Sequence, residues 1–190
     1  MTERKLPELL APAGDPEKLR AAIDFGADAV YLAGKAYGMR SNAGNFLPDE
    51  LTDAIRTAHA AGVKVYVTVN TMPRNDELSA LPEYLAFLSR AGADAVIVAD
   101  PGVAAMARKF APDVPMHVST QACVTNYAAA LAWHGLGASR IVLARELTLP
   151  EIAEIRERIP AELELECFVH GAMCVAYSGR CLLSSALMGR

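Results

Sequence analysis

Three of the four cysteines of this chain lie close together near its C-terminal end, and one of its four histidines stands among them. Cys167, Cys174 and Cys181 follow one another at intervals of seven residues, and His170 precedes Cys174 by four. Thiolate and imidazole groups act as nucleophile and base, or bind transition metals. The stretch 166–181 is therefore the part of the sequence richest in candidate chemistry.

This cluster admits four interpretations, which the residues alone leave open. Cys174 could be a nucleophile with His170 as its base, because a spacing of four places both on one helical face. Two thiolates and an imidazole could bind zinc, although the usual Cys-x2–4-Cys spacing is absent. Cys174 and Cys181 could be two of the cysteine ligands of an iron–sulfur cluster. The cysteines could instead be small buried hydrophobic residues, the interpretation favoured for Cys123 and Cys167.

A second set of polar residues follows the apolar runs that predict strands. Asn70 ends the third run, Gln121 follows the fifth, Arg145 and Glu146 follow the sixth, and His170 follows the seventh. The carboxyl ends of parallel strands meet at one edge of a sheet or at one mouth of a barrel, where α/β proteins bind their substrates. The sequence therefore predicts that these side chains share one site.

The elements that must position these residues alternate in a regular order. Short apolar runs predict strands at residues 9–12, 29–32, 64–70, 95–99, 116–119, 140–144 and 163–169. Amphipathic stretches with capping residues predict helices at residues 15–25, 47–62, 76–90, 100–110, 126–134 and 148–159. One strand and one helix recur every roughly 30 to 45 residues, the rhythm of a parallel sheet.

Seven such units favour a barrel over an open dinucleotide-binding sheet. The open sheet normally carries a glycine-rich phosphate turn after its first strand, and residues 11–16 lack that pattern. A complete (β/α)8 barrel takes about 250 residues. We therefore predict the α/β class, with a TIM-like barrel of about seven βα units that is incomplete in this chain. Residues 1–190 are expected to form a single domain, an N-terminal fragment of a longer protein.

Composition excludes several classes of protein. Of the 190 residues 53% are hydrophobic and 21% charged, and the net charge is −4, which argues against a disordered chain. No apolar run reaches the roughly 18 residues of a membrane span, and the N-terminal residues lack the apolar core of an export signal. Four cysteines are too few for a disulfide scaffold. We therefore expect a cytoplasmic protein with no membrane partner. The negative net charge does not indicate a nucleic-acid-binding surface.

The chain also carries, in order along its whole length, motifs of a known family. It resembles the collagenase-like peptidases of unassigned catalytic type, peptidase family U32, most specifically in the run His-Gly-Ala-x-Cys-x-x-Tyr-Ser-Gly-x-Cys. The matching motifs are residues 7–14, 26–32, 67–70, 119–122, 143–147, 168–174 and 177–184.

The resemblance implies an RNA-modifying enzyme more strongly than a protease. The better understood relatives are oxygen-independent hydroxylases of tRNA, rRNA or quinone precursors that bind a 4Fe-4S cluster, and the RNA-modifying ones depend on prephenate. By the family pattern Cys174 and Cys181 match the first two cluster ligands, and the other two come later than this chain extends. The same pattern implies an active site at the barrel mouth. We assign catalytic roles to His170, Glu146 and Arg145 and substrate binding to Asn70, Gln121, Tyr177 and Arg180.

Two other functions stay open beside the hydroxylase. A peptidase would act through Cys174 and His170, or through a bound metal such as zinc. A non-catalytic partner subunit would carry half of a cluster site within a homo- or hetero-oligomer. The substrate would accordingly be RNA, a small molecule or a peptide.

Overall fold

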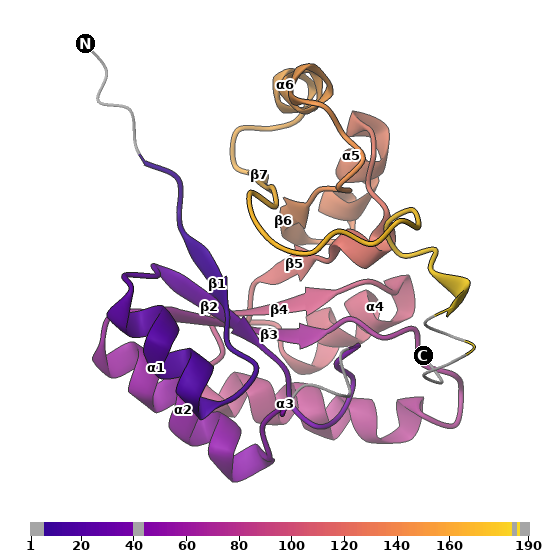
Figure 1. Ribbon diagram of the computed structural model, residues 1–190. Helices are drawn as coiled ribbons and strands as arrows, with labels where there is room; N and C mark the ends of the chain where they lie inside the picture. The colour runs from indigo at the N-terminus through magenta and orange to yellow at the C-terminus, as the bar shows by residue number, and fades with distance from the viewer. Residues whose placement is uncertain (1–5, 40–43, 184–185, 187–190) are drawn as a thin grey trace.

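Seven parallel strands form one sheet in which the spatial order of the strands equals their order in the sequence. A computed structural model describes residues 6–39, 44–183 and 186 (Figure 1). The strands in these residues are β1 (Leu10–Pro12), β2 (Ala29–Leu32), β3 (Lys64–Val69), β4 (Ala95–Val98), β5 (Met116–Val118), β6 (Ala138–Val142) and β7 (Glu164–Glu166). The sheet curls into part of a barrel, which confirms the predicted α/β, TIM-like class.

Helices connect the strands and cover the outer face of the curled sheet (Figure 1). The α-helices of the described residues are α1 (Pro16–Asp24), α2 (Pro48–Ala60), α3 (Leu81–Ala91), α4 (Pro101–Phe110), α5 (Tyr127–Gly135) and α6 (Leu149–Arg158). Two short 3-10 helices, η1 (Leu78–Ala80) and η2 (Thr120–Ala122), precede α3 and follow β5. The six predicted helices are therefore confirmed, with changed bounds.

Two predicted elements differ most from the structure at their ends. The helix predicted from residue 76 begins as η1 and becomes α-helical only at Leu81, next to Pro82, because proline is tolerated in the first helical turn and not within a helix. The strand predicted over 163–169 ends at Glu166, since its pairing partner β6 ends opposite it at Val142. Residues 167–169 therefore leave the sheet.

Side chains at the helix starts explain why the chain turns where it does. The carboxylates of Asp15 and Asp100 and the amide of Asn126 each accept a hydrogen bond of 2.9 Å from the backbone N–H three residues on. At α6 the Glu151 carboxylate accepts from both the N–H and the hydroxyl of Thr148, each at 2.7 Å. These bonds satisfy N–H groups that the first helical turn leaves unpaired.

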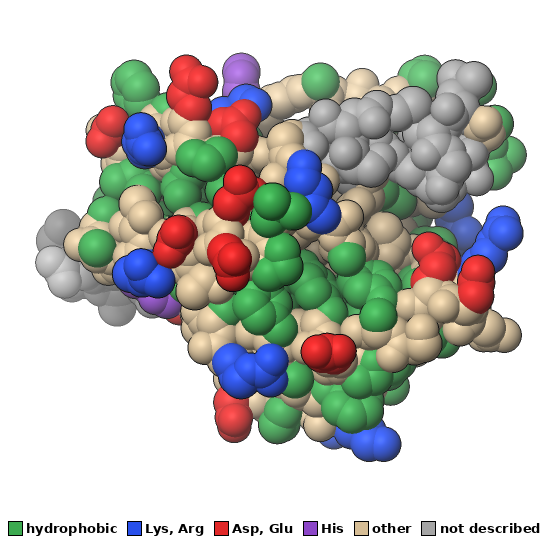
Figure 2. Space-filling model, turned by 90° about the horizontal axis from the view of Figure 1, so that it is seen from below, with side chains coloured by type: hydrophobic (Ala, Val, Ile, Leu, Met, Phe, Trp, Pro, Cys, Tyr) green, Lys and Arg blue, Asp and Glu red, His purple; other side chains and the backbone are tan. Residues whose placement is uncertain are grey.

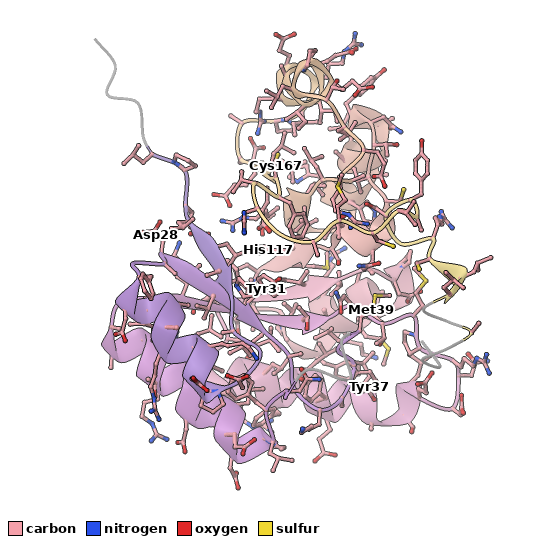
Figure 3. All side chains as sticks on the ribbon, viewed as in Figure 1. Asp28, Tyr31, Tyr37, Met39, His117 and Cys167 are labelled. Carbon is pink, nitrogen blue, oxygen red and sulfur yellow. The ribbon has the colours of Figure 1, made fainter. Side chains whose placement is uncertain are left out.

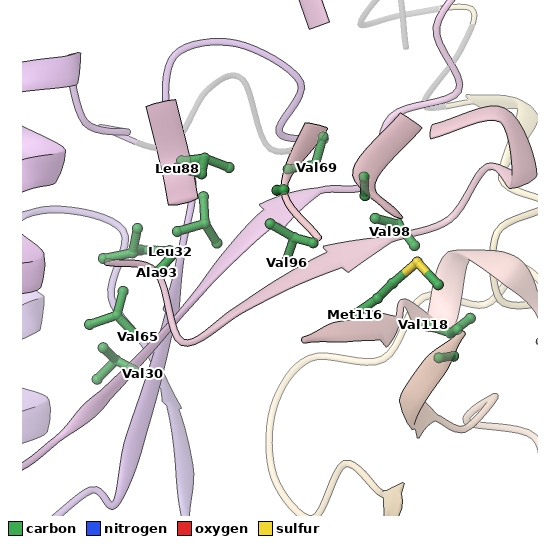
Figure 4. Packing of buried hydrophobic residues seen from close by; sticks show 14 of the residues in the cluster. Val30, Leu32, Val65, Val69, Leu88, Ala93, Val96, Val98, Met116 and Val118 are labelled. Carbon is green, nitrogen blue, oxygen red and sulfur yellow. The ribbon is translucent and has the colours of Figure 1, made fainter. Parts of the chain in front are cut away.

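The main core lies between the sheet and the helices. On β3 the side chains of Val65, Val67 and Val69 are fully buried against this layer, and Leu88 of α3 packs there too (Figure 4). The residue between two of these valines, Tyr66, belongs instead to a smaller cluster on the concave face of the sheet. Alternate residues thus divide between the helix-facing core and the barrel interior.

The concave face of the sheet holds a charged network. The Glu8 carboxylate accepts hydrogen bonds from Lys64 (2.8 Å), Tyr66 (2.7 Å) and Arg140 (2.7 Å). Arg140 also donates to Glu164 from Nε at 2.8 Å. Burial lowers the pKa of Arg140, but these carboxylates outweigh it and hold the pKa above its ordinary value. The guanidinium therefore stays charged and ties β6 to the segment before β1.

His117 of β5 lies beside this network on the concave side of the sheet (Figure 3). Its ring meets Tyr66 edge to face with centroids 4.7 Å apart. Burial first, and then the positive charge of Arg140, lowers the pKa of His117 to about 3. His117 therefore lies inside the barrel and is neutral at neutral pH.

The network predicts a loss of stability in acid. Burial raises the pKa of Glu8, but the hydrogen bonds from Lys64, Tyr66 and Arg140 outweigh it and lower the pKa from 4.5 to about 2. A carboxyl group whose pKa is lowered in the folded state contributes its full stabilisation above its unfolded-state pKa. The stabilisation by Glu8 is therefore lost as the pH falls from 4.5 towards 2. The shift equals about 3 kcal/mol, which solvent screening reduces to about 1–2 kcal/mol.

Urea unfolding between pH 6 and pH 2.5 would measure this loss, with Glu8→Gln as the control. The variant should be less stable than the wild type at pH 6 and should lose less stability on acidification. The pKa of Glu166 is raised, mainly by burial, so its protonation offsets part of the effect. Equal pH slopes for the two proteins would contradict the assignment to Glu8.

Acidic and basic side chains are interspersed on the face seen in Figure 2. In the described part of the chain no helix is long and apolar enough to cross a bilayer.

Candidate functional site

The carboxyl ends of the strands meet at one end of the curled sheet, where the segment after β7 also runs (Figure 1). This end carries Asn70 after β3, Ser119 after β5 and Arg145 after β6. Of the polar residues predicted to follow the strands, Asn70 and Arg145 therefore lie at one mouth.

Two strands contribute the first part of this mouth. The Nδ2 of Asn70 donates to the Ser119 hydroxyl at 3.3 Å, and its Oδ1 accepts from the backbone N–H of Met39 at 3.1 Å. The Ser119 hydroxyl also accepts at 3.3 Å from the N–H of Gln121, in the turn η2. The amide of Asn70 is thus held in one orientation, and Gln121 is placed at the end of β5.

Ser178 is the centre of the second part. Its side chain is fully buried, and its hydroxyl accepts hydrogen bonds of 3.3 Å from the Thr120 hydroxyl and from both the backbone N–H and Nε of Arg145. Its own N–H donates to the Glu146 carboxylate at 2.6 Å. Ser178 therefore joins the segment after β7 to the ends of β5 and β6.

Glu146 acts here as a hydrogen-bond acceptor for the backbone. Burial raises its pKa, but the hydrogen bonds from the Ser178 N–H, from its own N–H and from the Ser178 hydroxyl, together with the charge of Arg145, outweigh burial and place the pKa below its ordinary value. The carboxylate is therefore ionised at neutral pH. Its predicted part in proton transfer stays a prediction.

The residue after Ser178 must be glycine for this contact to form. Gly179 has φ of +71°, and a Cβ built on it would lie 2.0 Å from the carbonyl oxygen of Gln121. Both facts exclude a larger residue unless the backbone moves.

The remaining predicted site residues lie on the segment after β7. His170, Cys174, Tyr177 and Arg180 are all exposed there. The segment 167–181 contains no helix, so the expectation that His170 and Cys174 share one helical face is wrong. Gly171, with φ of +132°, turns the chain between them, and no hydrogen bond joins the two side chains.

The cysteines are the candidate ligands of a metal or cluster. Cys181 and Cys123 are partly buried, whereas Cys167 is exposed, so the expectation of a buried Cys167 is wrong because the strand ends before it. A four-iron cluster takes four thiolates. No group of three or more His, Cys, Asp or Glu side chains in the described ranges is arranged to hold a metal. These residues therefore do not make a complete zinc or cluster site, and Cys174 and Cys181 would be a partial ligand set.

A cavity of about 220 Å³ opens beside the mouth. Arg145 lines it together with apolar side chains, and Cys167 and Met173 bring the segment after β7 to its wall (Figure 3 labels Cys167). The cavity therefore combines one cation with an apolar lining.

The sequence analysis did not single out Ser119, Thr120 or Ser178 as site residues. All three are buried polar side chains, which are hydrogen-bonded in folded proteins. A Ser-Gly pair between two cysteines was the available signal for Ser178. Its partners follow β5 and β6 and are distant from it in sequence.

A curled parallel sheet, helices outside it and a polar mouth at the strand ends define a protein of the TIM-barrel class. A solved structure described as that of a U32 peptidase shares this fold, with a TM-score of 0.77, 22% identity, and coverage of 98% of this chain and 79% of that one. At that identity the likeness concerns the fold alone.

The model of peptidase family U32 matches residues 14–190, and the chain belongs to this family. It is 46% identical over 186 residues to the tRNA hydroxylation protein P1 of Bacillus subtilis, covering 98% of this chain and 44% of that protein. It is 42% identical over 183 residues to the 23S rRNA 5-hydroxycytidine synthase of Escherichia coli, covering 96% of this chain and 27% of that protein. The chain thus spans less than half the length of these relatives.

Proposed function

We propose that the protein carrying this chain hydroxylates a base in RNA, without oxygen and with the help of an iron–sulfur cluster. The relatives named for tRNA hydroxylation and rRNA hydroxycytidine synthesis support the reaction class. The observation that carries the proposal is the docking of the cysteine-bearing segment at Ser178, between Arg145 and Thr120.

The residues of this chain would bind and orient the reactants. Arg145 would bind an anionic cosubstrate of the prephenate type by charge-assisted hydrogen bonds, with Gln121 and Asn70 adding amide contacts. Tyr177 and Arg180 are exposed and would contact RNA through ring stacking and charge.

His170 is also exposed on this segment and would exchange protons with the substrate. Cys174 and Cys181 would supply two thiolates to the cluster. Its other ligands would come from beyond the described residues.

The proposal is tested by Cys174→Ala in the natural protein that carries this sequence, expressed in a host strain lacking the gene. We expect iron, acid-labile sulfide and the hydroxylated nucleoside all to fall to background, because the cluster loses a ligand. Iron and sulfide assays and mass spectrometry of digested RNA measure these quantities.

Cys167→Ala is the matched control, since Cys167 is exposed on the same segment and is not assigned as a ligand. It should retain both iron and product. A wild-type protein without iron after anaerobic reconstitution, or product formation that survives Cys174→Ala, would sink the proposal.

The peptidase alternative gains no support from the geometry. His170 and Cys174 are exposed and are not hydrogen-bonded to each other, whereas a nucleophile and its base lie within hydrogen-bond reach. Cleavage of gelatin that depends on Cys174 would nevertheless establish it. A partner subunit without catalysis would instead co-purify in fixed ratio with the active enzyme.

A further inference from the structure

The segment with Cys174 and Cys181 contacts the rest of the mouth at Ser178, which lies between the two cysteines. Two of its large apolar side chains are exposed: Val175 fully and Tyr177 by 64%. Ser178 is the contrast, with no exposed surface at all. The segment is therefore anchored by one buried serine between the two thiols.

The same hydroxyl also orients Arg145. Its Nε and its backbone N–H both donate to Ser178 Oγ, each at 3.3 Å. With Nε engaged, the guanidinium plane is fixed, and its terminal nitrogens remain available for a bidentate contact with an anion. Arg145 also lines the cavity of about 220 Å³ beside the segment.

Two further contacts make the anchor specific. The Glu146 carboxylate accepts from the Ser178 N–H at 2.6 Å, so the backbone is held as well as the side chain. Gly179 places its backbone against the carbonyl of Gln121 at a distance that admits no Cβ. The segment is thus held at Ser178 by residues that follow β5 and by residues that follow β6.

From this geometry we propose that Ser178 is a positioning residue that sets the thiol-bearing segment and the guanidinium of Arg145 in one fixed relation. One hydroxyl serves both groups, so a ligand that orders either of them also orders the other. Only the identity of those ligands, an anion at Arg145 and a metal at the thiols, rests on the proposed function.

Hydrogen exchange followed by mass spectrometry tests the anchor in this chain without RNA or metal. Ser178→Ala should speed exchange of the backbone amides in residues 171–183 by about tenfold or more, because local opening costs less. Exchange in α3 should stay unchanged. Ser139→Ala is the matched control, because the Ser139 hydroxyl also makes a hydrogen bond, which it donates to the Met116 carbonyl at 3.2 Å, but lies away from the mouth.

Glu146 supplies a second pair of variants. Glu146→Gln keeps an oxygen that can accept from the Ser178 N–H and should retain slow exchange, whereas Glu146→Ala should resemble Ser178→Ala. Rescue by the glutamine variant separates loss of this hydrogen bond from general damage to the fold. Exchange equally fast in both variants would contradict the role of the contact.

Thiol alkylation gives a readout at the cysteines themselves. Iodoacetamide should modify the partly buried Cys181 about tenfold faster in Ser178→Ala, while the exposed Cys174 serves as the internal reference. Unchanged exchange in 171–183, or an unchanged rate at Cys181, overturns the proposal. If both changes appear in Ser178→Ala but the wild-type protein does not hydroxylate RNA, only the proposed function is overturned.

Discussion

Replacing Arg140 by alanine is expected to lower the free energy of unfolding by about 3 kcal/mol. The Arg140 side chain is only 11% exposed and is paired with Glu8 at 2.7 Å and with Glu164 at 2.6 Å, while Glu166 lies 3.6 Å away. Removal of the single guanidinium leaves three carboxylates facing one another on the concave side of the sheet, without a counter-charge that reaches all three. Urea unfolding at pH 7, followed by circular dichroism, measures the change.

A surface ion pair provides the control for this variant. Arg56 lies 3.1 Å from Asp53 on α2, and both side chains are about 70% exposed. Arg56→Ala should change the free energy of unfolding by less than about 0.5 kcal/mol. If Arg140→Ala cost no more than Arg56→Ala, the concave network would contribute nothing to stability.

Replacing Gly179 by alanine is expected to release the segment after β7 from the mouth. The new Cβ would lie 2.0 Å from the carbonyl oxygen of Gln121, and the residue has φ of +71°, so the clash adds to the left-handed strain of about 1–2 kcal/mol. Trypsin should then cut after the exposed Arg180 about tenfold faster or more, since cleavage follows local opening.

Gly171→Ala separates strain from the clash. Gly171 lies on the same segment with φ of +132°, but no atom lies within 4 Å of a Cβ built there. This variant should leave cleavage at Arg180 close to the wild-type rate. A Gly179→Ala protein that resists trypsin as well as the wild type would show that the close approach to Gln121 is not needed.

The sequence predicted the fold well because its signals are local. Asp15, Asp100 and Asn126 stand at helix starts, and each accepts the expected hydrogen bond from the backbone. Along β3, alternate residues divide between the helix-facing core and the barrel interior, as the two-residue period of a strand requires. The predicted start of α3 and the predicted end of β7 were less accurate. A 3-10 turn precedes α3, and β7 ends where its neighbouring strand β6 ends.

Of the site, the sequence predicted only that the polar residues following the strands lie together. Topology brings Asn70 and Arg145 to one mouth, so their common location followed from the parallel sheet. The contacts of Ser178 could not be predicted, since Thr120 and Arg145 are 58 and 33 residues away along the chain. His170 was expected to work beside Cys174 through helical spacing, and the chain forms no helix there.

The order of the strands also has a consequence for how the chain assembles. Every strand pairs with the strand that precedes it in the sequence, so each unit needs only its predecessor as a template. Each pairing then spans only one crossover, the shortest sequence separation that a parallel pair allows, which limits the entropy cost of closing each loop. A chain emerging from the ribosome can therefore add one βα unit at a time, and the last strand added is the one whose edge needs protection from other chains.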